Sequence, residues 1–472
     1  MRKVLVLFLA LGAFSCKDDD SPLAPGQVFD PENPNLYVNA WIQEEMDFWY
    51  LWKSEFPTEP DEEQNPDDYF SSLLSTKDRF SWIQDDYLEL LGSLQGVSND
   101  TGHEIRYLND AQNPGNIIGQ ILYVKPGSPS DFAGMQRGDL ITHVNGTLLT
   151  AENYRDLNGD MNSSHDIEFL RYSFETDDFS TLGPVSINPV QFSENPNFLD
   201  TIFNYEGAKI GYYVYNQFTS GPTSADQSYV AEMDAIFQNF RSQRIDHLIV
   251  DLRYNPGGAI TVATNLGSLI GSGVTAQDVF ALRQYNDDLQ ELILNDATLG
   301  SNFLENKFEF KAANVGSLID KVYVLTGYRT ASASELLING LSPFMEVYMI
   351  GDTTVGKNQA SVSRFEENDP NNTWGIQPIV ASIGNSLGES DYEDGLFPNI
   401  ADQDLSRKLY PLGDIRENLL SFAIENITGV FPARIRRVDD GTRAVAQPFD
   451  PRLTAPVLLD DQKSSLLVKE LR

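Results

Sequence analysis

Cysteine and histidine are the residues that this chain has least of. A single cysteine, Cys16, occurs among 472 residues, so no disulfide can form within the chain and the fold must rest on its apolar core. The four histidines, His103, His143, His165 and His247, are scattered singly, without a second ligand at metal spacing. We therefore predict no metal site, and nothing else in the sequence indicates a cofactor.

Basic residues are also scarce, with 33 lysines and arginines against 69 acidic residues and a net charge of −36. Such an acidic surface repels nucleic-acid backbones and anionic headgroups, so nucleic acid is not an expected partner. The charge indicates nothing more specific about a substrate. With 41% apolar and 22% charged residues, the composition is that of a globular protein long enough for two or three domains.

Long apolar runs are absent except at the N-terminus. There, "MRKVLVLFLALGAFSC" places a short apolar run, residues 4–11, between two basic residues and Cys16. The run is too short to span a bilayer and predicts an export signal. A cysteine just after such a run resembles the cleavage site of bacterial lipoproteins. We expect a signal peptide at 1–15, a lipid on Cys16 and a tether at 16–36; an ordinary secretory signal with an incidental cysteine is the alternative.

The four residues that follow Cys16, "KDDD", resemble the acidic export tag of surface lipoproteins from the Bacteroidetes group. This resemblance implies a cell-envelope protein that is lipid-anchored to the outer membrane, either surface-exposed or facing the periplasm. We expect membrane contact through the lipid only. Because no pool of ATP or GTP exists outside the cytoplasm, nucleotides are not expected partners.

Helical and β patterns divide the next part of the chain into two regions. Residues 37–95 carry apolar side chains at helical spacing and predict an N-terminal helical region. Residues 96–182 contain a strand, a glycine turn and "GDLITHVNG", whose Asn-Gly pair predicts a hairpin. This stretch resembles the PDZ domains of bacterial proteases, with a generic small β domain as the alternative. The resemblance implies a loop that binds a peptide carboxylate, formed by Gly102, His103, Glu104 and Ile105.

Residues 183–430 alternate strands with helices, and buried-type strands appear in "HLIVDLRYNPGG", "KVYVLTG" and "EVYMIGD". Such alternation predicts a mainly parallel, layered α/β domain whose functional residues lie at the carboxyl ends of strands. Residues 431–472 have few periodic features, and we expect a C-terminal extension there. The predicted fold class is therefore α/β, or α+β over the whole chain, with helical, PDZ-like and layered parts in that order.

Ser332 follows one of these strands, in "LTGYRTASASELL", and has two interpretations. Ser332 and Glu335 form an S-x-x-E capping box, which needs no catalysis and is the simpler interpretation of this stretch alone. A serine at a strand-to-helix junction also lies beside unpaired N–H groups and the positive end of a helix. Those donors are what the oxyanion of an acyl-transfer reaction requires.

Lys357 also has two interpretations. "GDTTVGKNQ", residues 351–359, fits the first seven positions of a phosphate-binding loop but has Asn358 where a Ser or Thr should hold magnesium. Alternatively, Lys357 is a general base, because a serine nucleophile needs one and no histidine is expected near Ser332. A lysine can act in this way when burial lowers its pKa. The expected export disfavours the nucleotide loop.

Three motifs in a fixed order resemble the C-terminal processing, or tail-specific, peptidases. They are "DLRYNPGG" at 251–258, S-A-S-E at 332–335, and a Gly-Lys pair whose lysine lies 25 residues after the first serine. The similarity extends over residues 37–425. It implies a crotonase-like peptidase core preceded by a PDZ domain, with Ser332 as nucleophile and Lys357 as its general base. The likeness to a phosphate loop is then accidental.

The resemblance also implies the supporting residues of the site. One oxyanion N–H would come from Gly257 or Gly258 and the other from Ala333. Better-known members of the family orient the lysine with a glutamine four residues after it, but Ser361 holds that position here and Gln359 lies two residues after the lysine. In an extended chain both would project to the face of the lysine. We predict that Ser361 is the orienting residue.

Taken together, these features predict a serine endopeptidase with a Ser-Lys dyad that cuts exported proteins or peptides near their C-termini after PDZ recognition. The expected partners are polypeptides bound through their C-termini. One alternative is a catalytically idle surface lipoprotein that binds peptides with the PDZ region and a peptidase-like groove. A weaker alternative is an α/β surface protein that binds glycans, for which no aromatic platform is evident.

Overall fold

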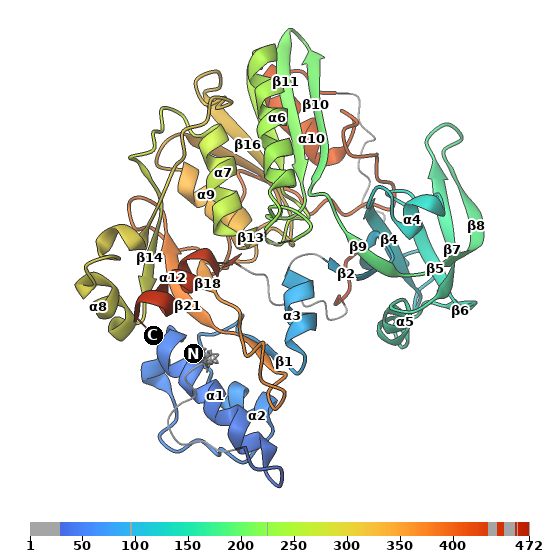
Figure 1. The fold of residues 1–472 in the computed structure, drawn as a ribbon. Coiled ribbons are helices and arrows are strands. Elements are labelled where there is room, and N and C mark those ends of the chain that lie inside the picture. The colour runs from blue at the N-terminus through green and yellow to red at the C-terminus, as the bar shows by residue number, and fades with distance from the viewer. Residues whose placement is uncertain are drawn as a thin grey trace, which may run out of the picture.

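The computed structural model describes residues 29–94, 97–223, 225–432, 441–447, 458–459 and 461–471. Cys16 and the predicted signal peptide lie outside these residues. Figure 1 shows a mixed α/β molecule in which a small helical region (blue) and a β domain (cyan to green) flank a larger layered domain. The predicted α/β fold class is confirmed. None of the described helices is both long and apolar enough to cross a membrane.

The N-terminal region, residues 34–94, is mainly helical, as predicted. Its elements are α1 Pro34–Trp49, η1 Lys53–Glu55, α2 Pro66–Leu73, β1 Trp82–Gln84 and α3 Tyr87–Leu94. The apolar face of α1 buries Trp41, Ile42 and Met46 against α2. Strand β1 pairs antiparallel with β20 (Gly375–Gln377), a strand of the layered domain. The region is therefore joined to the layered domain by a shared sheet as well as by packing.

The PDZ-like domain, residues 97–193, is an antiparallel sheet in the order β3-β4-β5-β7-β8 with two short helices. Its elements are β2 Val97–Asp100, β3 His103–Asn109, β4 Ile117–Val124, α4 Pro129–Phe132, β5 Leu140–Val144, β6 Thr147–Leu148, α5 Tyr154–Asp160, β7 His165–Ser173, β8 Asp178–Ile187 and β9 Val190–Ser193. Asn145 and Gly146 have φ values of 50° and 72° and connect β5 to β6, so the predicted hairpin is confirmed. The expected boundary at residue 182 falls inside β8.

The layered domain, residues 196–429, contains a six-stranded sheet in the order β10-β11-β12-β16-β17-β22. Its members are β10 Asn197–Tyr205, β11 Ala208–Tyr215, β12 His247–Asp251, β16 Lys321–Thr326, β17 Glu346–Gly351 and β22 Ile400–Ala401. Only β10 and β11 pair antiparallel; the other neighbours are parallel, as predicted. Leu248 and Val250 face one core and Ile249 the other, so the sheet is buried on both faces.

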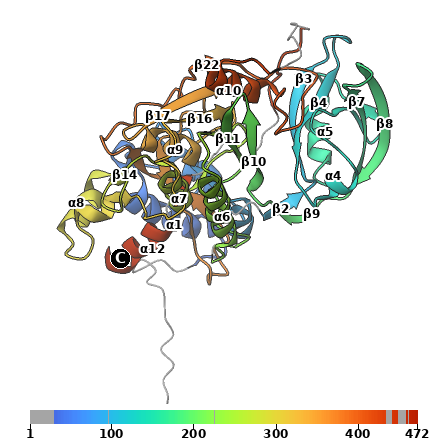
Figure 2. The ribbon, with the colours of Figure 1, turned by 90° about the horizontal axis from the view of Figure 1, so that it is seen from above.

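Helices cover both faces of this sheet (Figure 2). On one face lie α6 Ser228–Gln243, α7 Ile260–Ile270 and α9 Ala333–Leu341, and on the other lies α10 Asn418–Thr428. Because β16 and β17 are parallel neighbours, the loops that follow them leave the same edge of the sheet. One of these loops leads to Ser332 and the other to Lys357.

A second six-stranded sheet has the order β13-β23-β18-β21-β14-β15. Its members are β13 Gly258–Ala259, β14 Val279–Tyr285, β15 Glu305–Lys307, β18 Gln359–Ser361, β21 Ile379–Gly384 and β23 Leu458–Leu459. The remaining elements are α8 Asp287–Asn295, η2 Ser301–Leu304, β19 Arg364–Phe365 and α12 Asp461–Leu471.

The described parts of the C-terminal extension include secondary structure that its sequence does not predict. It contributes β23 to the second sheet, and in α12 the side chain of Leu467 is fully buried in the main core. The stretch "DQKSSLLVKEL" has only one short apolar face among charged residues. Its helix is stabilised by tertiary packing, which a local pattern does not reveal.

Buried ion pairs join the PDZ-like domain to the layered domain. Arg253, of the "DLRYNPGG" motif, binds Asp251 and Glu417 with N–O distances of 2.9 and 2.6 Å. Arg137 of the PDZ-like domain reaches the same Glu417 at 3.3 Å. Removing one partner of such a buried pair typically costs about 3–5 kcal/mol, because the other charge is left without compensation. Asp251 and Arg253 thus have a structural function that fixes how the two domains meet.

Candidate active site

Ser332 occupies a strained backbone position at the start of α9. Its φ and ψ are 60° and −114°, outside the regions that a side-chain-bearing residue prefers. Such a conformation costs on the order of 1–3 kcal/mol and persists only where the surroundings enforce it. Here Thr330 does so, since its hydroxyl donates to the carbonyl of Leu252 at 2.8 Å and its carbonyl accepts the N–H of Val355 at 3.0 Å.

The hydroxyl of Ser332 is not committed to capping the helix. The arrangement of a capping box is present, but only its Glu335 half forms a hydrogen bond, in which Glu335 Oε2 accepts the N–H of Ser332 at 2.7 Å. Ser332 Oγ is buried and has no hydrogen-bond partner in the described part of the chain. Because buried hydroxyls are rarely left unpaired in folded proteins, this atom is a candidate for a chemical function.

Glu335 connects the serine to the lysine. Its Oε2 accepts the N–H groups of Ser332 and Lys357 at 2.7 and 2.8 Å, while its Oε1 accepts from Gly356 N and Thr354 Oγ1 at 2.7 and 2.5 Å. Burial raises the pKa of Glu335, and these hydrogen bonds oppose that shift. Four donors directed at two oxygens are best satisfied by the ionised form. The carboxylate therefore holds the two loops against each other.

Lys357 is buried, and its environment favours the neutral amine. Burial lowers the pKa of Lys357 to about 7, although the carboxylates of Asp78 and Glu335 act in the opposite direction. Its Nζ lies 5.0 Å from the centre of the Phe80 ring. The preceding residue must be glycine, because Gly356 has a φ of 86° and a Cβ there would lie 2.1 Å from the carbonyl oxygen of Glu393.

Asp78 and Phe80 belong to the N-terminal region and were not predicted to take part in the site. Asp78 Oδ1 accepts the N–H groups of Phe80 and Ser81 at 2.9 and 2.8 Å, and its Oδ2 accepts the hydroxyl of Tyr50 at 2.9 Å. The sequence "DRFSWI" gives a local signal for this turn, since aspartate commonly binds the backbone two residues on. It gives no signal for the contact with Lys357, which lies in a different domain.

The structure places the glycine turn beside Ser332. The carbonyl of Asn255 accepts the N–H of Ala331 and the hydroxyl of Ser334, both at 3.2 Å. The N–H of Gly257 donates to Asn255 Oδ1 at 2.9 Å, so it already has a partner. Ala333, the other predicted donor, is the first residue of α9 and is buried.

Gly258 can only be glycine for reasons of space as well as conformation. Its φ is 136°, and a Cβ there would lie 2.2 Å from the carbonyl oxygen of Phe218. The backbone of the turn is thus free to approach a neighbouring strand closely.

The two candidates for orienting Lys357 have different surroundings. Gln359, Ala360 and Ser361 pair with Ser382, Ala381 and Ile379, so the extra residue at this register shift is Val380 of β21, and β18 itself is uninterrupted. Ser361 is fully buried, and its Oγ accepts from Gln377 Nε2 at 3.1 Å. Gln377 Oε1 is buried without a partner among the described residues. Gln377 was not predicted, because it comes from β20, a separate strand.

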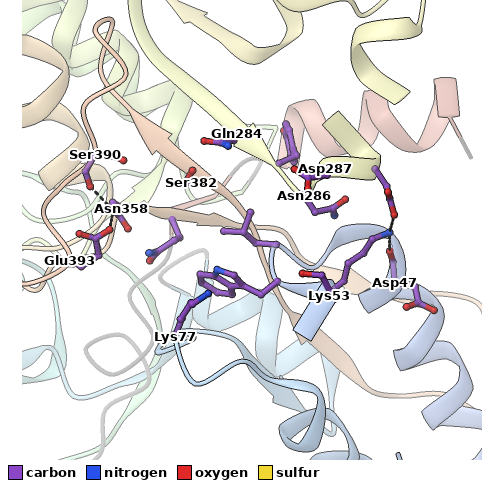
Figure 3. A pocket seen from close by; sticks show the side chains of 16 residues that line it. Asp47, Lys53, Lys77, Gln284, Asn286, Asp287, Asn358, Ser382, Ser390 and Glu393 are labelled. Carbon is purple, nitrogen blue, oxygen red and sulfur yellow. Dashed lines mark hydrogen bonds and ion pairs between the residues drawn. The ribbon is translucent and has the colours of Figure 1, made fainter. Parts of the chain in front are cut away.

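Gln359 is only partly buried and lines a cavity of about 730 Å³. Figure 3 shows this cavity between Lys53 and Lys77 of the N-terminal region and Asn286 and Asn358 of the layered domain. The cavity is lined mainly by polar and charged side chains.

The predicted carboxylate-binding loop lies against the layered domain. His103 Nδ1 is 2.6 Å from Ser130 Oγ, and Glu104 pairs with Lys125 at 3.1 Å. The other oxygen of Glu104 accepts from Arg329 at 2.7 Å, and Arg329 also donates to the carbonyl of Ile105 at 2.8 Å. Since Arg329 is three residues before Ser332, the start of β3 is linked directly to the serine loop. No cluster of metal-binding side chains occurs within the described residues.

Three parts of the chain match known families. Residues 209–401 match peptidase family S41, residues 37–82 match the N-terminal domain of S41 peptidases, and residues 120–158 match a PDZ domain. The layered domain is therefore similar to the S41 peptidases over most of its length. All of the predicted dyad and oxyanion residues fall within the S41 match.

Similar proteins include a C-terminal processing peptidase and a CtpA-like serine protease. A chloroplastic C-terminal processing peptidase of Tetradesmus obliquus is 26% identical over 275 residues, which cover 56% of this chain and 52% of that protein. An assigned CtpA-like serine protease of Staphylococcus aureus is 24% identical over 304 residues, covering 60% and 51%. The chain thus spans about half the length of these curated relatives.

Among solved structures, a crystal structure from Bacteroides fragilis NCTC 9343 that is assigned to the S41 proteases is 25% identical. It superposes with a TM-score of 0.68 over 82% of this chain and 97% of that one. The fold of most of this chain therefore recurs in that structure.

Replacing Glu335 tests whether its carboxylate holds the site together. We expect Glu335→Gln to lower the free energy of unfolding by about 2–4 kcal/mol, because an NH₂ group would face N–H donors and leave them unsatisfied. Urea unfolding followed by tryptophan fluorescence measures this loss. The control Glu346→Gln changes an exposed carboxylate and should alter stability by less than about 1 kcal/mol. Equal midpoints for both variants would contradict this role of Glu335.

Proposed function

We propose that this protein is a serine endopeptidase of the C-terminal processing type with a Ser332–Lys357 dyad. The observation that carries the proposal is a buried lysine with a pKa of about 7 on a loop that Glu335 joins to the backbone of Ser332. An amine of this kind accepts a proton at neutral pH, which an exposed lysine cannot do. The match of residues 209–401 to family S41 supports the same activity.

In the proposed reaction, Ser332 Oγ attacks the scissile carbonyl while Lys357 Nζ takes the hydroxyl proton. The resulting lysine ammonium then gives this proton to the leaving amine, and an acyl-serine ester remains. A water molecule, deprotonated by the now neutral lysine, hydrolyses the ester and regenerates the serine. The desolvated position of Lys357 suits both roles, because a base with a pKa near the working pH both accepts and returns a proton readily.

The oxyanion is proposed to bind at the glycine turn and the start of α9. Because the N–H of Gly257 already donates to Asn255, Gly258 is the better candidate for one donor. The N–H of Ala333 is the other, and it lies at the positive end of α9. Two such fixed donors stabilise the charge of a tetrahedral intermediate without reorganisation.

We propose that a hydroxyl–amide pair takes the place of the family's orienting glutamine. Ser361 stands four residues after Lys357, and Gln377 donates to its Oγ. The glutamine is then supplied from β20 rather than from the lysine's own strand. Ser361, fixed by Gln377, would in turn limit the rotamers of the lysine side chain.

The idle peptide-binding alternative is less well supported. A protein that only binds peptides needs neither a buried lysine with a lowered pKa nor a serine in a strained backbone conformation. Both features cost stability, as is common at functional sites. The proposed substrates are exported polypeptides, recognised at their C-termini by the PDZ-like domain.

The dyad predicts that Ser332→Ala and Lys357→Ala each reduce cleavage of an unfolded reporter with an apolar C-terminal tail by at least about a thousandfold. The double variant should lose no more than either single variant, because the two residues act as one unit. Ser334→Ala is the matched control and should retain most activity, since Ser334 donates only to the Asn255 carbonyl. Gel-based cleavage rates and circular dichroism separate catalysis from folding. Wild-type rates in Ser332→Ala would refute the dyad.

The pKa of Lys357 predicts the pH dependence. The lysine is a base only when neutral, so kcat/KM should fall as pH decreases below about 7 and reach a plateau above about 8. The Asp78 carboxylate raises the pKa of Lys357. Asp78→Asn should therefore lower this pKa further and shift the acidic limb of the pH profile of kcat/KM to lower pH. Initial rates at constant ionic strength between pH 5 and 9 measure both curves. An acidic limb at the same pH in Asp78→Asn and the wild type would argue against Lys357 as the titrating base.

We also propose that Cys16, which lies outside the described residues, carries a lipid that anchors the protein in the outer membrane. Its support is the sequence of the first 20 residues alone. Cys16→Ser removes the chain's only thiol, and the variant is expected in the soluble fraction after a salt wash, whereas the wild type stays with membranes. Metabolic labelling with a fatty-acid analogue provides a second measurement. Labelled Cys16→Ser would show that the acceptor lies elsewhere.

A further inference from the structure

A segment of the C-terminal extension lies along the free edge of the PDZ-like sheet. Ala444 pairs antiparallel with Leu108 of β3. The N–H of Asn109 donates to the carbonyl of Arg443 at 3.0 Å, and the N–H of Val445 donates to the carbonyl of Tyr107 at 3.2 Å. Residues 443–445 therefore pair with β3 as a short added segment of strand, which is the way in which PDZ domains hold their peptide ligands.

Side chains complete this contact. Gln447 acts like a further backbone unit, since its Oε1 accepts the N–H of Tyr107 at 2.8 Å and its Nε2 donates to the carbonyl of the same residue at 3.1 Å. The hydroxyl of Tyr154, on α5, donates to the carbonyl of Ala446 at 2.6 Å. Val445 packs against the core of the domain. The segment is thus held between β3 and α5.

The direction of this strand matches that of a bound peptide. Because it runs antiparallel to β3, its sequence proceeds toward the start of β3. The start of β3 is where residues 102–105, the predicted carboxylate-binding loop, are located. A polypeptide tail bound for cleavage would have to use the same edge in the same direction.

A second segment of the extension lies at the proposed catalytic centre. Strand β23 pairs in parallel with β13, with Leu458 opposite Gly258 and Leu459 opposite Ala259. On its other side, Leu459 is opposite Ser361 of β18. The backbone of the extension therefore fills the position between the glycine turn and the strand that follows Lys357. In this state Ser332 and Lys357 are only 0% and 1% exposed.

Helix α12 anchors the extension beyond this point. Leu467 is fully buried in the main core, and Lys463 donates to the carbonyl of Glu305 at 2.7 Å. Figure 1 shows α12 (red) beside the second sheet, near β18 and β21. Residues 441–447 and α12 thus fix the extension on either side of β23.

We propose that the C-terminal extension is a built-in occupant of the substrate path, which inhibits the peptidase until a substrate polypeptide displaces it. It fills both places where an extended chain would bind, the β3 edge and the gap between β13 and β18. The inhibitory role rests on the proposed function, but the binding of the extension at these two places can be measured without catalysis. As a tethered ligand, the extension acts at a high effective concentration, so free peptides bind weakly until it is loosened.

Binding of a peptide in trans tests the occupancy. The probe is a fluorescein-labelled synthetic peptide of residues 441–459, and the protein is the full chain with Ser332→Ala to prevent cleavage. Val445→Pro removes the N–H that donates to Tyr107, and Gln447→Ala removes two further contacts with the same residue. Each should loosen the extension, and fluorescence anisotropy should show about fivefold to tenfold tighter binding of the probe.

The matched control is Ala444→Pro. In an antiparallel pair of this kind the N–H of residue 444 points away from β3, so the substitution keeps the two backbone bonds and should change probe affinity by less than about twofold. Thermal unfolding establishes that each variant is folded. Unchanged affinity in both Val445→Pro and Gln447→Ala would overturn the proposal, as would an equal gain in Ala444→Pro.

Cleavage assays separate this inference from the proposed function. In the active chain, Val445→Pro should raise kcat/KM for the unfolded reporter by about fivefold to tenfold, and the added probe peptide should raise KM without changing kcat. If no variant cleaves but the probe binds more tightly to Val445→Pro, the occupancy stands and the peptidase proposal fails. If the wild type and Val445→Pro cleave and bind equally, the peptidase proposal stands and the inhibitory extension fails.

Discussion

The carboxylate of Glu335 is the interaction on which the site depends. One of its oxygens accepts the N–H groups of both Ser332 and Lys357, so the backbones of the proposed nucleophile and base meet at a single atom. This explains why the motif is S-A-S-E rather than a serine in any helical context. The fourth residue of the motif fixes the strained serine and also holds the lysine loop, although 25 residues separate them in the chain. A change in the position of this carboxylate would therefore displace the backbones of both Ser332 and Lys357.

The same arrangement explains why the N-terminal region recurs with the peptidase domain. A lysine keeps a neutral amine near pH 7 only if water is excluded, and the N-terminal region contributes to that exclusion. Phe80 lies over the amine, and Asp78 sets how far its pKa falls. The N-terminal region, joined through β1 and β20, thus completes the desolvated environment. Burial lowers the pKa of Lys357, the carboxylates of Asp78 and Glu335 raise it, and burial is the larger effect.

The sequence predicted much of the fold and the identity of the proposed dyad, but little of the dyad's surroundings. Alternating strands and helices, the Asn-Gly hairpin and the motifs around Ser332 and Lys357 are local patterns. Asp78, Phe80 and Gln377 act across domains or strands, and no periodicity encodes such contacts. For the same reason the C-terminal extension, whose strand and helix depend on tertiary pairing, was predicted only as an extension.

A tethered occupant held mainly by its backbone has consequences for substrate choice. Main-chain hydrogen bonds supply affinity with little regard to sequence, whereas specificity comes from pockets for individual side chains. A competing polypeptide must therefore offer an extended strand long enough to reach both the β3 edge and the catalytic sheet. A folded protein cannot do so, because its strands are already paired, and a short peptide forms only one of the two contacts. Displacement of the extension would thus select unfolded or tail-bearing chains by length and accessibility before any side chain is recognised.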